Sequence, residues 1–166
     1  MIRKAIKDDI SKIVNIMKDV VNKMISEGNP QWDSSYPTKD IYLKDIENED
    51  LYVFIKGDQI VAAACINQIQ AEEYKNIKWK ISSDNSFVIH RIIIDPNFQN
   101  QGIAVDFMKF AEKLAIKSNV FSIRIDTFSM NKKAQNLFKK LGYFEVGKVY
   151  FRNKKEPFIC FEKNII

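Results

Sequence analysis

The chain has 166 residues, of which 46% are hydrophobic and 28% are charged, and this composition predicts one globular domain with a buried core. Its net charge is +5, but the lysines are scattered among acidic residues without a basic block, so we expect no nucleic acid partner. Neither an apolar run of 18 residues nor an apolar signal core is present, which predicts a cytoplasmic protein without a membrane span. Two isolated cysteines and one histidine argue against a disulfide framework and against a metal site.

The first half of the chain predicts a strand, two helices and a hairpin. In chain order we expect a strand at 2–6, a helix from 8 or 9 to 28–30, a loop at 31–37, a helix at 38–47, and strands at 51–55 and 59–67. Asp8 or Asp9 can cap the first helix, and Gly28-Asn29-Pro30 ends it. Thr38 can cap the second helix, and Gly57 suits the turn of the hairpin.

The second half predicts two strand–helix–strand crossovers and a final pair of strands. In chain order we expect a polar stretch at 72–84, a strand at 87–94, a helix from Gly102 to about 118, a strand at 120–126, a helix from Asn131 to Gly142, and strands at about 143–151 and 157–162. Hairpins combined with crossovers indicate an α+β fold with a mixed, mostly antiparallel sheet.

Residues 92–104 join a β-branched strand to a helix through a short polar loop. The strand ends at Asp95-Pro96, and Gly102 opens the helix. The amides of a first helical turn have no partner inside the helix, and the helix dipole favours negative charge there, so we expect a phosphate-bearing ligand. A dinucleotide fingerprint would need three spaced glycines, and a P-loop would need Gly-Lys-Ser or Gly-Lys-Thr, and the chain has neither pattern here.

Two motifs resemble those of the GNAT superfamily of N-acyltransferases. The first is Gln99-x-x-Gly102-x-Ala104, which is similar to the family's acyl-CoA signature. The second is Asn131-x-x-Ala134-x-x-Leu137-Phe138-x-Lys140-Leu141-Gly142-Tyr143. Their order and spacing agree with the family, and so does the order of elements over 1–166. The resemblance implies a single N-acetyltransferase domain. Its mixed sheet would have about seven strands flanked by four helices, with a splay between the strands at 87–95 and 120–126.

The resemblance also implies acetyl-CoA as the acyl donor, with no metal. The residues that it places at this cosubstrate are Ile92, Ile93, Ile94, Gln99, Asn100, Gln101, Gly102, Ile103, Ala104, Val105, Asn131 and Phe138. The amides of 100–105 would hold the pyrophosphate, and a main-chain N–H near Ile92 would polarise the thioester carbonyl. The side-chain amide of Asn131 would bind the pantetheine arm, and Asn131 can cap its helix as well.

The proton-transfer groups stay open at this stage. Phe138 occupies the position of the family's usual tyrosine, so the thiolate would need Tyr143, Ser129 or water as a donor, or would leave unassisted. His90 and Asp126 are the candidate bases. An ordinary hydrogen-bonded histidine and a turn or capping aspartate are the alternatives.

Trp32, Asp33 and Tyr36 lie where the family builds its acceptor pocket, and we expect them to bind substrate. Trp32 could instead anchor its loop onto the core. The predicted activity is direct transfer of an acetyl group from acetyl-CoA to a primary amine, most simply that of a small molecule, in a ternary complex. The alternatives are acetylation of a protein or peptide N-terminus, and a non-catalytic acyl-CoA-binding module, which the phenylalanine in the second motif motivates. Pairing of C-terminal strands into a homodimer is a further expectation from the resemblance.

Overall fold

The computed structural model describes residues 1–151 and 154–165. Its strands in these residues are β1 (Ile2–Lys4), β2 (Leu51–Lys56), β3 (Gln59–Asn67), β4 (Ser86–Ile94), β5 (Ser122–Phe128), β6 (Phe144–Val149) and β7 (Phe158–Asn164). Its α-helices are α1 (Ile10–Ser26), α2 (Lys39–Glu47), α3 (Ile103–Lys117) and α4 (Lys132–Lys140). Each expected strand and helix is therefore found, with ends that differ by a few residues from the predicted ones.

The strands form one mixed sheet in the order β1-β2-β3-β4-β5-β7-β6. Pairing is antiparallel for β1 with β2, β2 with β3, β5 with β7 and β6 with β7, and it is parallel for β4 with β5. In the part of the chain that the structure describes, the parallel register joins Ser86, Phe87 and Val88 to Ser122, Ile123 and Arg124 and stops there. The mixed, mostly antiparallel sheet predicted from the sequence is confirmed, and parallel pairing that stops this early agrees with the predicted splay.

The chain forms two compact units. Unit 1 comprises Met1–Ile66 and His90–Phe110, and unit 2 comprises Asn67–Ile89 and Ala111–Ile166. Both β4 and α3 are thus shared between the units. The assignment of 1–166 to a single domain stays a prediction.

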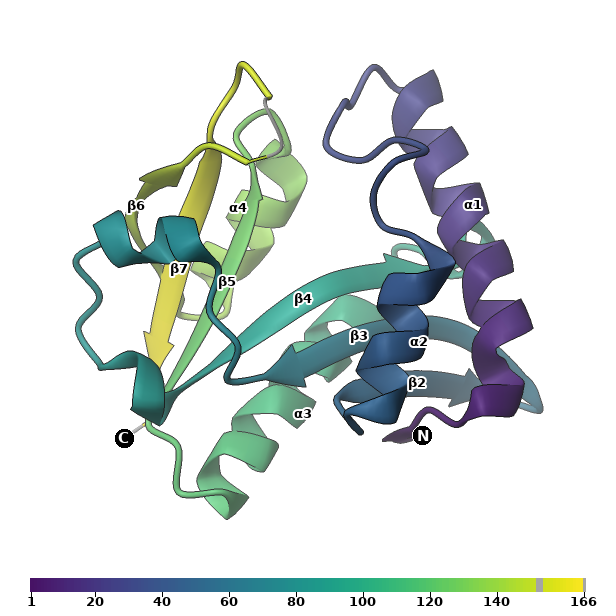
Figure 1. The fold of residues 1–166 in the computed structure, drawn as a ribbon, viewed down its shortest axis with the longest axis horizontal. Helices are drawn as coiled ribbons and strands as arrows, with labels where there is room; N and C mark the ends of the chain where they lie inside the picture. Colours follow the sequence, from purple (N-terminus) through teal and green to yellow (C-terminus); the bar gives the residue numbers. More distant parts are fainter. Residues whose placement is uncertain (152–153, 166) are drawn as a thin grey trace. The chain divides into compact units, whose positions relative to one another are not determined.

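In unit 1, α1 and α2 lie side by side against β2 and β3 (Figure 1). Apolar residues at helical spacing on α1, among them Ile13 and Ile16, are fully buried against the strands. The side chain of Thr38 caps α2 as expected by accepting from the amide of Ile41. The expected cap of α1 by Asp8 or Asp9 is wrong, because no side chain caps this helix and Asp9 bonds to residues before it.

In unit 2, α4 and the segment 68–85 lie on opposite sides of β5 and β7 (Figure 1). The segment includes a short 3₁₀ helix, η2 (Glu72–Asn76), and was expected only as a polar stretch. Its Tyr74, Ile77 and Trp79 pack on one face of the strands. Phe138 of α4 packs on Phe161, which projects from the other face of β7.

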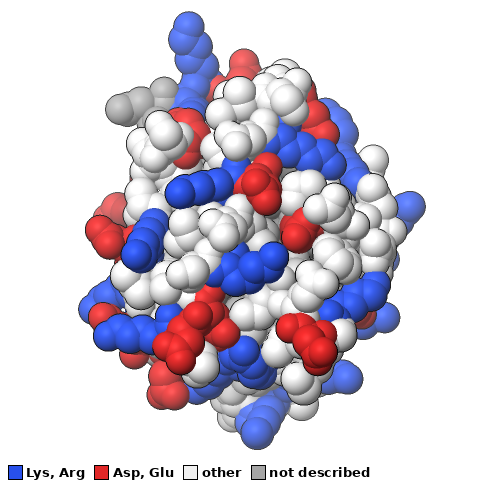
Figure 2. Space-filling model, turned by 90° about the vertical axis from the view of Figure 1, so that its right-hand side faces the viewer, with Lys and Arg blue, Asp and Glu red and all other residues white. Residues whose placement is uncertain are grey.

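Charged side chains are interspersed over the face of the molecule in Figure 2, where lysine and arginine alternate with aspartate and glutamate. A single-sign patch, which would favour a nucleic acid partner, is not seen on this face. In the described residues, no helix has the length and apolar character that crossing a membrane requires.

Candidate functional site

The loop between β4 and α3 is shaped by local hydrogen bonds and by two left-handed residues. The carboxylate of Asp95 accepts from the main-chain N–H of Asn97 at 2.9 Å, which fixes the turn after the strand. Asn100 and Gly102 then adopt positive φ angles of 62° and 82°. Two left-handed residues so close together curl the main chain, and the glycine adopts its conformation without steric cost.

The first amides of α3 have no acceptor inside the helix. The N–H of Asp106 donates to the carbonyl of Gly102 at 3.0 Å. The amides of Ile103, Ala104 and Val105 precede this bond, so the helix itself offers them no acceptor. A Cβ placed on Gly102 would meet no atom within 4 Å, so the space beside this glycine is open. The amides of the first turn and the open position at Gly102 together suit the binding of a pyrophosphate group.

Two lysines outside the motif contact this loop. The ammonium of Lys23 on α1 donates to Oε1 of Gln99 at 2.7 Å, and that of Lys56 on β2 donates to Oε1 of Gln101. Both cations add to the positive potential of the helix N-terminus. Sequence reasoning missed them because they lie 76 and 45 residues from their partners along the chain.

The strand β4 is irregular next to the predicted oxyanion donor. Arg91, between His90 and Ile92, has a φ of 52° in an otherwise extended strand. Regular alternation along a strand would place His90 on the same side as Ile92, and the left-handed residue between them interrupts it. His90 is half-buried, and Ile93 is buried in the core of unit 1.

Arg91 forms a buried ion pair with Asp45 of α2 that the sequence analysis did not identify. Its Nη2 lies 2.7 Å from both carboxylate oxygens, and its Nε lies 3.1 Å from one of them. The side chains are only 14% and 8% exposed. Burial raises the pKa of the Asp45 carboxyl, and the neighbouring guanidinium opposes that rise. The pair therefore fixes β4 to α2 in a poorly solvated environment.

The aromatic loop at 31–37 is joined to the same ion pair. Nη1 of Arg91 donates to the hydroxyl of Tyr36 at 3.3 Å. The carboxylate of Asp33 accepts from the amide of Ser35 at 2.8 Å, so it stabilises the loop internally. Trp32 is only 6% exposed and packs in the core of unit 1, which favours an anchoring role for it. Substrate binding by Trp32, Asp33 and Tyr36 stays a prediction.

In unit 2, Asp126 accepts a short hydrogen bond from the hydroxyl of Tyr74, with 2.5 Å between the oxygens. Burial raises the pKa of Tyr74 well above its usual value, and the charge of Asp126 adds to this rise. The alternative of a turn or capping aspartate is wrong, because β5 continues to Phe128 and Asp126 lies within it. A half-buried carboxylate within a strand remains a candidate base.

Asn131 caps α4, as expected. Its Oδ1 accepts from the amide of Ala134 at 3.1 Å. A carboxamide also has two N–H donors, which this cap does not use. Asn131 can therefore cap its helix and still donate to a ligand.

Phe138 and Tyr143 lie in an apolar environment. They are 6% and 2% exposed, and their ring centroids are 6.3 Å apart. Burial raises the pKa of the Tyr143 hydroxyl, and in the described residues this buried hydroxyl has no hydrogen-bond partner. A hydroxyl that ionises so reluctantly is a weak proton donor to a leaving thiolate. The role of Tyr143 as the acid stays a prediction.

The fold and the loop are those that an acyl-CoA-dependent acyltransferase needs: a mixed seven-stranded sheet, and a helix N-terminus suited to an anion after the loop that follows β4. The model of the acetyltransferase (GNAT) family matches residues 18–143, so the chain belongs to this family. It is therefore an enzyme that transfers an acetyl group from acetyl-CoA to an amine acceptor. In the described residues, no cluster of His, Cys, Asp and Glu could hold a metal ion.

Solved structures agree with this assignment. A GNAT-family acetyltransferase of Streptococcus agalactiae 2603 is 25% identical, with a TM-score of 0.85 over 99% of this chain and 94% of its own. A Staphylococcus aureus Mu50 protein named as an acetyltransferase is 28% identical, with a TM-score of 0.77 over 100% and 99%. The yncA protein of Salmonella typhimurium, whose structure contains its cofactor acetyl-CoA, shares the fold at 14% identity with a TM-score of 0.73 over 100% and 94%. A comparison by sequence with curated proteins gave no match.

Proposed function

We propose that this enzyme acetylates the primary amine of a small molecule by direct transfer from acetyl-CoA in a ternary complex. The observation that carries the proposal is the loop at Gly102, where amides without an acceptor inside the helix, an open position at the glycine and two lysine contacts occur together. A backbone cradle of this kind binds a pyrophosphate without any catalytic side chain. The donor half of the reaction is thus supported by geometry within unit 1.

We assign the roles of individual residues in the reaction from their places in the fold. An N–H at Ile92 polarises the thioester carbonyl, and the irregular residue before it sets the direction of that N–H. His90 or Asp126 accepts the proton of the amine, and Asn131 binds the pantetheine arm. Acetyl-CoA supplies the activated acyl group when bound. No residue is assigned as the acid, because Phe138 has no hydroxyl and the hydroxyl of Tyr143 is buried.

A small acceptor is favoured by the loop at 31–37. Its internal hydrogen bonds, its buried tryptophan and its link to Arg91 give a fixed wall with little room to adapt. Acetylation of a peptide N-terminus is the alternative within the enzyme class, and it needs an extended groove. A cytoplasmic location, the absence of a nucleic acid partner and a homodimer remain parts of the proposal.

The test is thiol release from acetyl-CoA with a panel of amines, run beside thermal unfolding with and without acetyl-CoA. We expect acetyl-CoA to raise the melting temperature and small primary amines to give turnover, whereas peptides with a free N-terminus do not. Turnover with peptides alone would establish the alternative acceptor class. Binding of acetyl-CoA without turnover for any amine would support a non-catalytic module, and no binding would refute the donor half.

The same assay assigns the base. We expect His90→Ala or Asp126→Asn to reduce turnover at neutral pH while acetyl-CoA still raises the melting temperature as in the parent enzyme. Asp84→Asn, at an exposed carboxylate of unit 2, is the matched control. A variant that keeps the parent pH–rate profile excludes that residue as the base.

A further inference from the structure

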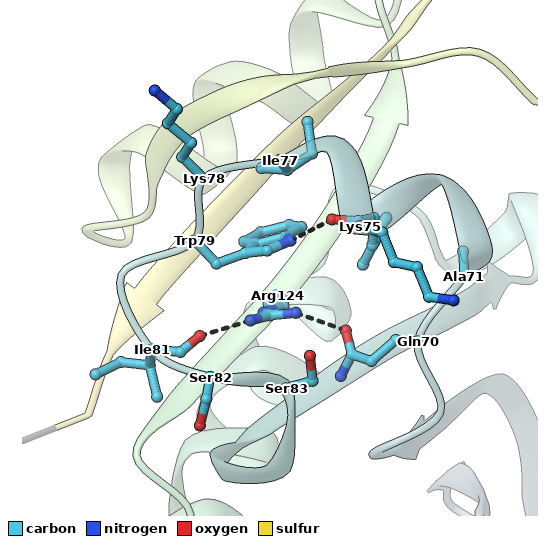
Figure 3. Close-up of a pocket in the computed structure, with 11 residues that line it drawn as sticks. Gln70, Ala71, Lys75, Ile77, Lys78, Trp79, Ile81, Ser82, Ser83 and Arg124 are labelled. Atoms are coloured by element: carbon cyan, nitrogen blue, oxygen red, sulfur yellow. Dashed lines mark hydrogen bonds between the residues drawn. The ribbon is translucent and has the colours of Figure 1, made fainter.

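Unit 2 contains a cavity of about 500 Å³ between the segment 68–85 and β5. The residues that line it are Gln70, Ala71, Tyr74, Lys75, Ile77, Lys78, Trp79, Ile81, Ser82, Ser83 and Arg124. Figure 3 shows Arg124 at the centre of this ring, with Trp79 on one side and Ser82 and Ser83 on the other. None of these residues is among those assigned to acetyl-CoA or to the acceptor.

Arg124 is only 1% exposed, yet its hydrogen bonds go to neutral oxygens. Nη1 donates to Oε1 of Gln70 at 2.9 Å, and Nη2 donates to the carbonyl of Ile81 (Figure 3). The guanidinium carbon lies 4.2 Å from the centre of the Trp79 ring, so an aromatic face covers it. The Nε atom is buried and has no partner in the described residues.

A buried arginine normally has a carboxylate partner, because an unpaired charge in the interior is costly. Glu162 pairs with Arg124 in the register of β5 and β7, but its carboxylate is occupied by other donors. It accepts from the hydroxyl of Ser122 at 3.0 Å and from the amides of Lys80 and Ile81 at 2.9 and 3.0 Å. Within the described part of the chain, no carboxylate lies at ion-pair distance from Arg124. Burial lowers the pKa of this guanidinium, and Glu162 opposes that change.

The lining is cationic and has an apolar wall. Lys75 and Lys78 belong to the lining, which includes no acidic residue of the described chain, and Trp79 and two isoleucines supply apolar surface. Glu72 pairs with Lys75 at 2.8 Å, but both side chains are more than 70% exposed, and such a pair opens at little cost. An anion in the cavity would supply the direct ion pair that the buried guanidinium does not form with the described residues.

We propose that this cavity binds a small organic anion, with its carboxylate or phosphate group at Arg124 and its apolar part against Trp79. Every residue that carries the proposal lies outside the two motifs and the acceptor loop, and Tyr74 of the lining, which donates to Asp126, connects the cavity to a candidate base. Binding can be measured without turnover.

The test uses the indole N–H signals in nuclear magnetic resonance spectra, because the chain has only two tryptophans. The N–H of Trp79 donates to the carbonyl of Tyr74 at 2.9 Å, so its signal reports on the cavity directly. Trp79→Phe identifies it by removing one signal. Titration with sodium benzoate and, separately, with sodium phosphate is carried out at constant ionic strength. We expect saturable shifts of the Trp79 signal with at least one of these probes, while the Trp32 signal stays in place.

Variants separate the site from general salt effects. Lys75→Gln/Lys78→Gln changes only exposed residues, and we expect it to weaken the apparent affinity by about tenfold. Arg124→Lys keeps the charge but loses the planar donors, and it should abolish the saturable shift. Lys139→Gln/Lys140→Gln, at exposed positions of α4, is the matched control and should bind as the parent protein does.

Saturation with benzoate alone or phosphate alone identifies the group that binds. Absence of saturation with both, or equal saturation in the parent and the Lys75→Gln/Lys78→Gln variant, would overturn the proposal.

Discussion

At the scale of single residues, Arg91 determines the local geometry next to the predicted reaction centre. A left-handed conformation costs a residue with a side chain about 1–2 kcal/mol, so other contacts must stabilise it. Asp45 contacts the guanidinium with both carboxylate oxygens, and the hydroxyl of Tyr42 donates to the Arg91 carbonyl at 3.5 Å. Side chain and main chain of Arg91 are thus both held by α2. We conclude that the pair maintains the irregular conformation of β4.

Asp45→Asn tests this conclusion. The variant leaves a buried guanidinium without a counter-charge, so we expect the free energy of unfolding to fall by about 3 kcal/mol. Urea unfolding measures this loss. Asp40→Asn, at an exposed position of the same helix, should change the free energy by less than about 0.5 kcal/mol. The double variant Asp45→Leu/Arg91→Met should recover part of the loss, because it removes both charges together. Equal stability of Asp45→Asn and the parent protein would show that the pair does not hold β4.

At the scale of elements, the sequence predicted those features of helices and turns that depend on residues close together along the chain. The helix start at Gly102, the cap by Asn131 and the hairpin turn at Gly57 are specified by a few consecutive residues, and all three are found. The contacts of Lys23 and Arg124 escaped prediction because their partners lie 76 and up to 54 residues away. Periodicity can show that such residues are polar or buried, but not which distant groups they contact.

Gly102→Trp tests the loop at the start of α3, and the chain provides a matched control. Gly57 has a similar positive φ, 61° against 82°, and equally open surroundings, but it lies in the turn between β2 and β3. We expect Gly102→Trp and Gly57→Trp to lose similar stability, about 1 kcal/mol, because each forces a side chain into a left-handed conformation. Only Gly102→Trp should lose binding of acetyl-CoA, because its indole fills the space in front of the amides.

Thermal unfolding with acetyl-CoA separates the two variants. At a ligand concentration 100 times the Kd, binding stabilises the folded state by about 2.7 kcal/mol, and this gain should persist in Gly57→Trp and vanish in Gly102→Trp. Retention of the gain in both variants would place the pyrophosphate elsewhere.

At the scale of the whole molecule, the resemblance to a family predicted more of the fold than physical reasoning about single segments did. The order of strands and helices over the chain follows the GNAT pattern, and this made the fold predictable at 25–28% identity to solved structures. The acceptor was not predictable in the same way. Its pocket depends on loops such as 31–37, where contacts between distant segments decide whether an aromatic residue anchors the loop or faces a ligand.

We expect the free energy of unfolding of the whole molecule to fall at acidic pH, in part because Asp9 becomes protonated. Its carboxylate accepts from Arg3 at 2.8 and 3.0 Å and from the amide of Ile6 at 2.8 Å. The hydrogen bond from Arg3 lowers the pKa of Asp9 below its usual 3.8, and burial opposes this only in part. A pKa that is lower in the folded state means that the unfolded chain takes up the proton first as the pH falls. The contribution of Asp9 is therefore present in full above this usual value and is lost as the pH falls through the folded-state pKa.

Asp9→Asn should reveal this dependence when urea unfolding is compared at about pH 6 and about pH 3. We expect the variant to lose about 1–2 kcal/mol at the higher pH, because a charge-assisted pair becomes a weaker neutral contact. At the lower pH the difference from the parent protein should shrink, because the parent carboxylate is then losing its charge as well. Asp8→Asn, at the exposed neighbouring position, should follow the parent protein at both pH values. A loss in Asp9→Asn that is equal at both pH values would mean that Asp9 acts through packing, and that its ionisation does not contribute to the acid sensitivity of the fold.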